Sequence, residues 1–368
     1  MRISKLLGKT LREVPADADT ISHQYLIRAG MISQLTAGVY SMLPLGLRVQ
    51  RKIENIIREE SDKAGGQELQ MPVLHPLELW QKSGRDAGMA DVLFHLKDRR
   101  NHDMVLGPTE EEIITDLVSH NVQSYRDLPI MPYQIHTKLR DEPRPRGGLL
   151  RVREFVMHDL YSFDADEKGL DISYEKLRQA YSNIFTRCGL ATLLVEADSG
   201  AIGGKDSYEF MLIAPSGEDE IIFCEKCKCA ANVEKMIAVK GRVEEEEPLP
   251  LETVNTPGIT SIADLSAFLK IHPSSTLKAV LYVADGEFVM ALIRGDLEIN
   301  EIKLKKVLHA VDLRLANETE VAAAGIVAGF VSPVGLQARV KVIADDSVVP
   351  GVNYAAGANK KDTHYRNV

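Results

Sequence analysis

The sequence has few cysteines, few aromatic residues and no long apolar run. Aromatic residues make up 6% of its 368 positions. Of the four cysteines, three crowd between Cys224 and Cys229, too closely for a disulfide framework, so we expect reduced thiols in a cytoplasmic protein. No stretch approaches the roughly 20 apolar residues of a membrane helix, and the first residues hold too short an apolar run for a secretory signal. We therefore expect no membrane association.

An excess of positive charge is also missing. The chain carries 44 lysines and arginines against 53 aspartates and glutamates, a formal net charge of −9. A generic polyanion binder would be basic, so binding of nucleic acid here requires a local basic patch that overcomes net repulsion. The remaining composition, 45% hydrophobic and 26% charged, is that of a globular protein long enough for about two domains.

The first part of the chain alternates helical and strand-like patterns. Apolar residues at helical spacing predict a helix over 47–65 that ends at Gly65-Gly66, followed by a strand over 68–74. Alternating patterns predict two strands, 131–140 and 149–163, around a loop, and then a helix over 174–188. These elements favour an α+β fold with an antiparallel sheet flanked by helices, which we assign to a first domain over residues 1–223.

An acidic, proline-containing stretch near 242–250 predicts a connector, which we place at residues 224–260. Beyond it, Ser261 with Asp264 predicts a capped helix, and Asp285-Gly286 predicts a hairpin between strands over 277–283 and 288–294. A helical pattern follows over 301–308. Residues 261–368 are therefore expected to form a second, mixed α/β domain.

The segment from Lys138 to Phe155 carries five arginines beside three acidic residues. Arginines at the ends of paired strands direct planar guanidinium groups into a common cleft, where they bind phosphate oxygens in pairs. The loop between them, Pro143 to Gly148, is rich in proline, arginine and glycine and is suited to contact a nucleic-acid backbone. A solvated charged hairpin with no ligand is the alternative that composition alone leaves open.

Several segments resemble one known family. Arg140-x-Glu142, the basic loop and Arg151-x-Arg-Glu-Phe155 resemble motif 2 of class II aminoacyl-tRNA synthetases, specifically the prolyl-tRNA synthetases of bacterial type. The helix and strand that close in Gln70-Met-Pro72 resemble motif 1, the dimer-forming element. Leu106-Gly-Pro-Thr-Glu-Glu-Glu112 resembles the Thr-x-Glu loop of that family, and Ala197-Asp-Ser-Gly-Ala-Ile-Gly-Gly204 resembles its glycine segment beside the proline pocket.

The resemblance implies a proline–tRNA ligase that uses ATP with Mg²⁺, activates proline to prolyl-adenylate and transfers it to tRNA(Pro). It implies that Arg140 grips the α-phosphate of ATP and stabilises the charge that develops there, without a protein nucleophile. Glu142 would meet the adenine or the terminal adenosine of tRNA, and Arg151 would lie along the ATP site. Arg144 and Arg146, in the loop, would contact tRNA. A homodimer through motif 1 is also implied.

For proline itself, the resemblance implies that Thr109 and Glu111 hold the secondary ammonium and that Gly203 and Gly204 line the pocket. A second interpretation treats Thr109 as the N-cap of a helix with Glu112 at the third position, and both interpretations are compatible. The glycines are not a P-loop, because the required Lys-Ser or Lys-Thr pair does not follow them. The family has an aromatic residue where this chain has Gly147.

The second module resembles the editing insertion of bacterial prolyl enzymes. The resemblance implies editing roles for Lys278, for Gly329 and Pro333 in the loop that ends at Gly335, and for Asp345 and His364. Editing has a physical reason, since a pocket that accepts proline cannot exclude the smaller alanine, each lost methylene being worth only about 1–3 kcal/mol. A separate hydrolytic site would remove alanine from tRNA(Pro). The alternative for any one of these residues is an ordinary surface position.

The cysteine cluster Cys224-x-x-Cys227-x-Cys229 has too few neighbouring ligands for a closed zinc site, so we predict no metal and reduced thiols instead. The chain ends at Val368, inside the implied editing insertion, and no motif 3 with its later ATP-binding arginine is found. Two alternatives therefore stay open beside the ligase: a hydrolase that edits mischarged tRNA in trans, and a catalytically silent tRNA-binding or dimerisation protein.

Overall fold

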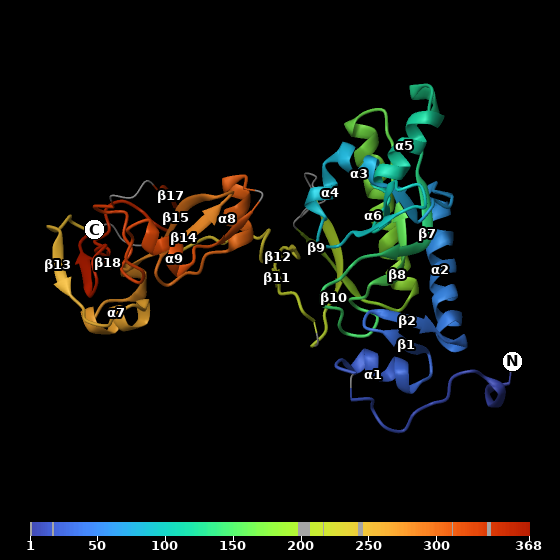
Figure 1. Cartoon of the computed structure of the whole chain (residues 1–368), viewed down its shortest axis with the longest axis horizontal. Coiled ribbons are helices and arrows are strands. Elements are labelled where there is room, and N and C mark those ends of the chain that lie inside the picture. The colour runs from blue at the N-terminus through green and yellow to red at the C-terminus, as the bar shows by residue number, and fades with distance from the viewer. Residues whose placement is uncertain are drawn as a thin grey trace. The chain divides into compact units, whose positions relative to one another are not determined.

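The structure is a computed structural model that describes residues 2–16, 18–197, 207–215, 217–241, 246–310, 312–336 and 340–368. The chain divides into two compact units, Met1–Ala230 and Ala231–Val368 (Figure 1). Each unit has its own helices and sheets, and most strand pairs are antiparallel, so the α+β prediction is confirmed. The division into a catalytic domain, a connector and an editing domain stays a prediction. None of the described helices is both long and apolar enough to cross a membrane.

The helices of the first unit begin and end at recognisable residues. Helix α2 starts with Pro44 in its first turn and ends at Gly65, whose φ of 98° suits a left-handed cap, as predicted. Helix α6 starts earlier than the predicted 174, because the Asp166 side chain accepts a hydrogen bond from the backbone of Gly169. The helices are α1 (Ile21–Arg28), α2 (Pro44–Ala64), α3 (Leu77–Ser83), α4 (Arg85–Gly88), α5 (Glu111–Asn121) and α6 (Glu167–Arg187), with short 3₁₀ turns at Ile3–Lys5 and Tyr125–Asp127.

The central sheet of the first unit has the order β3-β7-β8. Strands β7 and β8 are antiparallel, with Tyr133 opposite Leu160 and Leu139 opposite Glu154, and β3 is parallel to β7. The predicted strand over 149–163 is shorter in the structure, since the chain first turns through Gly147 and Gly148. Its members are β3 (Gln67–Glu68), β7 (Pro132–Leu139) and β8 (Glu154–Leu160).

Three further sheets lie in this part of the chain. The sheet β4-β6-β5 packs with α3 around a small core of Trp80, Leu93 and Val105. Helices α2 and α6 lie against each other, linked by hydrogen bonds from Arg187 and Asn183 to Glu60. The strands are β1 (Ile32–Thr36), β2 (Val39–Met42), β4 (Leu74–Pro76), β5 (Phe94–Lys97), β6 (Asp103–Leu106), β9 (Thr192–Glu196), β10 (Tyr208–Leu212), β11 (Ile221–Phe223) and β12 (Ala230–Asn232).

The second unit is built on the sheet β16-β14-β15-β17, with an apolar cluster on each face. Leu281 and Met290 belong to one cluster, and Tyr282 and Ala291, their neighbours along the strands, belong to the other. The β14–β15 hairpin turns at Asp285 and Gly286, both at positive φ, as predicted. The strands of this sheet are β14 (Leu277–Ala284), β15 (Glu287–Arg294), β16 (Leu313–Leu315) and β17 (Lys341–Ala344).

A small second sheet, β13-β19-β18, joins the predicted connector to the end of the chain. Strand β13 lies inside the range expected to be a connector, so part of that range is ordered by pairing with β19. Ser261 caps α7 by accepting from the backbone of Asp264, as predicted, and its hydroxyl donates to the Asp264 carboxylate. The remaining elements are α7 (Ile262–Leu269), a 3₁₀ turn (Pro273–Ser275), α8 (Glu301–Leu308), α9 (Glu318–Ala323), β13 (Glu252–Asn255), β18 (Ala356–Gly357) and β19 (Thr363–Arg366).

Candidate functional site

The candidate site of the first unit lies where the loop before α5 meets the end of β7. The Gly107 backbone N–H donates to the Val73 carbonyl at 2.8 Å, and its carbonyl accepts from the Leu139 N–H at 3.1 Å. A side chain at Gly107 would come within 2.5 Å of the His75 ring, so only glycine fits this approach. The loop is thereby held against the strand that carries Arg140.

Thr109 and Glu111 form the pair expected from the sequence. The Thr109 hydroxyl donates to Glu111 Oε2 at 2.6 Å, and Arg85 Nη1 lies 3.1 Å from the same oxygen. Among the described residues no hydrogen bond is found to Glu111 Oε1. The N-cap interpretation of Thr109 is wrong, because α5 starts after Glu110 and its cap position makes no side-chain hydrogen bond. The Thr109 hydroxyl is bound to a carboxylate instead of to the helix backbone.

Arg140 lies directly beside this pair. Its Nε and Nη2 atoms both donate to the Pro108 carbonyl at 3.3 Å, and its guanidinium covers the Phe155 ring at 5.2 Å. Burial lowers the pKa of Arg140 from its ordinary value, opposed by the nearby carboxylates of Glu111 and Glu142. Arginine remains charged at neutral pH despite such a shift. The arrangement holds a partly desolvated cation at the end of a strand, ready for an anion.

Glu142 and Arg151 are also brought together. Arg151 Nε lies 2.8 Å from Glu142 Oε2, and the Arg144 backbone N–H donates to Glu142 Oε1 at 3.1 Å. The pKa of Glu142 is lowered, since these hydrogen bonds outweigh the cost of burial. Both residues therefore sit at the mouth of the hairpin as a hydrogen-bonded ion pair.

The basic loop is anchored at its tip. The Gly147 N–H donates to Asp19 Oδ2 at 3.0 Å, which lowers the pKa of that aspartate, and Arg146 pairs with Glu218 at 2.6 Å. Gly147 and Gly148 have φ of 68° and 66°, a region unfavourable for the aromatic residue usual in the family. A side chain at Gly148 would also meet the ring of His23 at 2.8 Å. The departure at Gly147 thus has a local structural reason.

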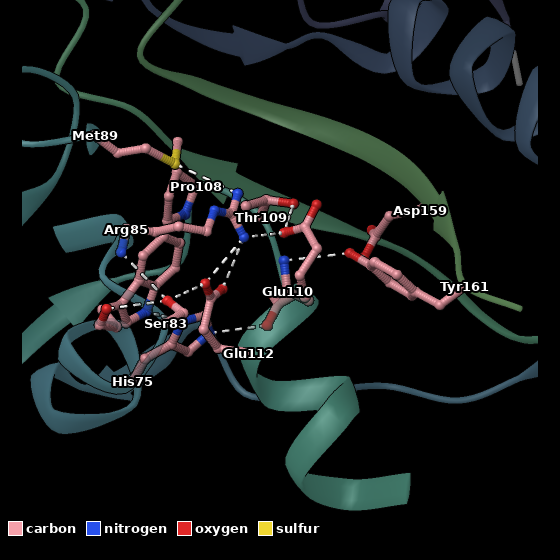
Figure 2. A network of polar contacts seen from close by, with 12 residues as sticks. His75, Ser83, Arg85, Met89, Pro108, Thr109, Glu110, Glu112, Asp159 and Tyr161 are labelled. Carbon is pink, nitrogen blue, oxygen red and sulfur yellow. Dashed lines mark hydrogen bonds and ion pairs between the residues drawn. The ribbon is translucent and has the colours of Figure 1, made fainter. Parts of the chain in front are cut away.

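A buried polar cluster beneath this site was missed by the sequence analysis. Lys138 is fully buried, with Nζ 2.9 Å from Glu110 Oε1 and 3.2 Å from Asp159 Oδ1. The Tyr161 hydroxyl donates to Asp159 at 2.8 Å and accepts from the Glu110 backbone N–H at 3.2 Å (Figure 2). Burial raises the pKa of Asp159, and hydrogen bonds from His75 and Lys138 lower the pKa of Glu110 against its burial. The available signal was a lysine within a predicted strand whose partner strand carries an aspartate.

The two pocket glycines, Gly203 and Gly204, lie outside the described residues. The strands on either side, β9 and β10, are paired from Thr192 with Leu212 to Glu196 with Tyr208. The pocket role of these glycines stays a prediction.

In the second unit, Lys278 lies on β14 opposite Ile293. Its Nζ donates to the Leu297 carbonyl at 2.9 Å and lies 2.6 Å from the exposed carboxylate of Glu298. Along the strand Lys278 shares its face with Tyr282, which packs under α8. The lysine is therefore partly buried and paired, not a freely solvated side chain.

His364 lies on β19, which pairs with β13 and β18. It is buried, its Nδ1 is 2.6 Å from the Thr256 hydroxyl, and its ring contacts that of Phe330 at 5.3 Å. Burial lowers the pKa of His364 from its ordinary value. The loop with Gly329 and Pro333 is bonded to the segment that leads into β19. Asn359 in that segment hydrogen-bonds to the backbone of Phe330, Ser332 and Val334.

Asp345 is held by Lys240, whose Nζ lies 2.5 Å from Oδ2, and its carboxylate accepts from the Ser347 N–H at 2.9 Å. These contacts lower its pKa despite burial. No hydrogen bond or ion pair among the described residues connects Asp345, Lys278 and His364 with one another. The structure thus brings the loop of Gly329 and His364 together, and pairs Lys278 with Glu298 and Asp345 with Lys240.

The described part of the chain contains no preformed metal site. No group of three or more His, Cys, Asp or Glu side chains there is arranged to hold a metal ion. The cysteines Cys224, Cys227 and Cys229 are exposed free thiols on the turn between β11 and β12. The use of Mg²⁺ stays a prediction.

Comparisons with known proteins agree with the motifs. The chain is 62% identical over its whole length to a protein named "Proline--tRNA ligase" from Dehalococcoides mccartyi strain 195, and covers 64% of that protein. It is 52% identical to the "Proline--tRNA ligase" of Syntrophomonas wolfei, of which it covers 65%. A family model described as the aminoacyl-tRNA editing domain matches residues 256–368. The chain thus spans about two thirds of the length of these relatives.

Solved structures show a partial likeness. A prolyl-tRNA synthetase of Cryptosporidium parvum, solved with L-proline and AMP, has 15% identity and a TM-score of 0.47, and the likeness covers 55% of this chain and 42% of that one. The likeness extends over only part of the fold.

Proposed function

Because the chain is related over its whole length to bacterial proline–tRNA ligases, we propose that it carries out the ATP-dependent activation of proline and its transfer to tRNA(Pro), with hydrolytic editing of alanyl-tRNA(Pro). The first unit would hold the synthetic site and the second unit the editing site. ATP, proline and tRNA would be substrates, and no covalent intermediate with the protein is required.

In the activation step, the carboxylate of proline attacks the α-phosphorus of ATP and pyrophosphate leaves. Arg140 would stabilise the charge on the α-phosphate, since its guanidinium is half-buried, stacks on Phe155 and donates to the Pro108 carbonyl. The ammonium of proline would bind Glu111 Oε1 and Thr109, both next to Arg140. Glu142 and Arg151 would line the nucleotide side.

In the transfer step, the terminal hydroxyl of tRNA attacks the carbonyl carbon of the adenylate and AMP leaves. Arg144 and Arg146 would contact the tRNA backbone from the anchored loop. Arg146 would exchange its exposed ion pair with Glu218 for a phosphate, an exchange that costs little because exposed pairs contribute weakly.

Dimerisation through the motif 1 element is part of the proposal. Helix α2 exposes apolar side chains, with Val49 46% and Ile53 42% exposed, although they line a groove against β7 and β8. A second copy that covers this helix would remove that apolar area from water. Sedimentation analysis of wild type and of Ile53→Glu tests this part.

In the editing step, water attacks the ester carbonyl of alanyl-tRNA(Pro) and free alanine and tRNA are released. Lys278 would position the terminal ribose or phosphate of the tRNA. Gly329, Pro333, Asp345 and His364 would complete the site. The editing-domain match, residues 256–368, lies within the second unit, so an enzyme that only edits in trans is the alternative.

The observation that carries the synthetic function is the Thr109–Glu111 pair beside Arg140. Binding of a non-hydrolysable prolyl-adenylate analogue, measured by calorimetry against the alanyl and seryl analogues, tests it. We expect selective binding of the prolyl compound, lost in Glu111→Gln and kept in Asp116→Asn on the exposed side of α5. Absence of binding with retained alanyl-tRNA(Pro) hydrolysis would favour the trans-editing enzyme, and tRNA binding alone would favour the silent protein.

A further inference from the structure

Glu110 lies between the two residues of the proposed proline pair, yet it faces away from them. Thr109 and Glu111 bond to each other, whereas Glu110 is fully buried and bonds to Lys138. Figure 2 shows its carboxylate near His75 and its backbone nitrogen near Tyr161. The backbone of one residue therefore fixes where both of its neighbours point.

The buried contacts of Glu110 come from three strands. His75 on β4 lies 2.9 Å from Oε2, Lys138 on β7 donates to Oε1 at 2.9 Å, and Tyr161, just after β8, accepts from the backbone N–H at 3.2 Å. The tyrosine is fixed in turn by Asp159. The loop is thus anchored to the sheet through Glu110, in addition to the contact of Gly107 with the end of β7.

A buried charged cluster usually adds no more stability to a core than apolar side chains would. Buried charges lose hydration that their mutual attraction only partly restores, and well-packed apolar residues are often equally stable. What a charged cluster adds is fixed distances and directions. Here the fixed element is the loop that presents Thr109 and Glu111.

We propose that Glu110, held by Lys138 and Tyr161, is a positioning residue that sets the spacing of Thr109 and Glu111 and thereby the selectivity of the site for the cyclic secondary amine of proline over the primary amine of alanine. This inference rests on the proposed function. It assigns to Glu110 no contact with the substrate. A small displacement of the pair would reduce selectivity, because misplacement of about 1 Å can cost as much as 100-fold.

The chain contains its own probe of this cluster. Trp80 is the only tryptophan. Its Nε1 donates to His75 Nδ1 at 3.4 Å, its ring stacks on His75, and Arg85 covers it at 5.3 Å. Tryptophan emission therefore reports on the side of the cluster where His75 meets Glu110.

The test compares Glu110→Gln, Tyr161→Phe and wild type in calorimetric titrations with the prolyl- and alanyl-adenylate analogues. We expect Glu110→Gln to bind the prolyl analogue about tenfold more weakly, with a smaller ratio of prolyl to alanyl affinity and altered Trp80 emission. Tyr161→Phe should weaken binding of the prolyl analogue by less than Glu110→Gln does, but it should also reduce the ratio of prolyl to alanyl affinity by more than twofold. The matched control is Glu60→Gln, which removes another buried carboxylate that binds Lys63 and Arg187 far along α2.

A merely structural cluster would lower the thermal midpoint in Glu110→Gln as in Glu60→Gln and leave the affinity ratio within twofold of wild type, which would overturn the inference. If Glu110→Gln does not fold, Tyr161→Phe decides by the same criterion, and loss of folding in both variants also counts against it. Failure of wild type to bind the prolyl analogue is a different result, because it removes the proposed function and the inference with it.

Discussion

The two units hold their candidate residues in opposite ways. In the first unit, Thr109 bonds to Glu111, Arg140 lies beside them, and the whole loop rests on a buried charged cluster. In the second unit, Lys278 bonds to an exposed glutamate, and His364 is buried and bonded to Thr256. In the first site Thr109 and Glu111 contact each other, whereas in the second Lys278, Asp345 and His364 each have other partners among the described residues.

The difference follows from where the residues lie in the sequence. Arg140 and Glu142 come from the end of one strand, and Arg151 faces them across the turn, so strand pairing alone brings them together. Lys278 and His364 come from strands of two different sheets, whose relation no local pattern sets. Activity at the first site should therefore be sensitive to the loss of a single charge, and activity at the second should depend more on how bound tRNA arranges the residues.

The largest effect is expected for Arg140→Ala in proline-dependent ATP–pyrophosphate exchange. Loss of one preorganised charge at a reacting group typically costs about 3–4 kcal/mol, so exchange should fall several hundredfold while the affinity for proline changes less. Arg178→Ala, at a surface arginine paired with Glu175 on α6, is the control. Near-normal exchange in Arg140→Ala would show that Arg140 does not stabilise the reacting phosphate, and the contrast between the two sites would then fail.

A pH titration of stability compares the buried imidazoles of the two units. Burial lowers the pKa of His158 from 6.5 to about 4, so the native first unit holds it neutral while the unfolded chain protonates it. Stability should therefore fall as pH drops from about 6.5 to 4, by about 3 kcal/mol at most.

Urea unfolding followed by Trp80 fluorescence measures this effect in the first unit. His158→Gln should flatten the dependence, and His120→Gln, on the exposed surface of α5, should not. An unchanged slope in His158→Gln would contradict the assignment. His364 in the second unit is shifted in the same direction by burial, so circular dichroism of the whole chain should show an acid loss that survives in His158→Gln.

Features set by local sequence could be predicted, and features set by the pairing of distant strands could not. The α2 helix and the β14–β15 hairpin were predictable because caps and turns are local, and the Thr109–Glu111 pair was expected only from the family resemblance. The Glu110 cluster was not, since its members come from β4, β7 and β8 and only strand pairing brings them together. The same reason left the partner of His364, Thr256, unrecognised.

Lys278→Ala addresses the second site. We expect hydrolysis of alanyl-tRNA(Pro) to fall about tenfold or more, equal to about 1.4 kcal/mol, with adenylate-analogue binding unchanged. The thermal midpoint should hardly change, because the partner of Lys278 is the exposed Glu298. Lys305→Ala, at an exposed position of α8, is the matched control. Hydrolysis within twofold of wild type would remove Lys278 from the editing site.

The smallest effects are expected in the basic loop, which belongs to the first unit but acts on a large partner. Arg144→Ala and Arg146→Ala should each weaken tRNA binding by about 1 kcal/mol and reduce the slope of log affinity against log salt by about one, the loss of one phosphate contact. Binding of the prolyl-adenylate analogue should not change, since the bond from Gly147 to Asp19 still anchors the loop when either arginine is replaced. Filter binding at several salt concentrations measures the slope. Equal losses for tRNA and for the analogue would mean that the loop arginines support the adenylate site itself, and the first site would then extend further than the contacts of Arg140 indicate.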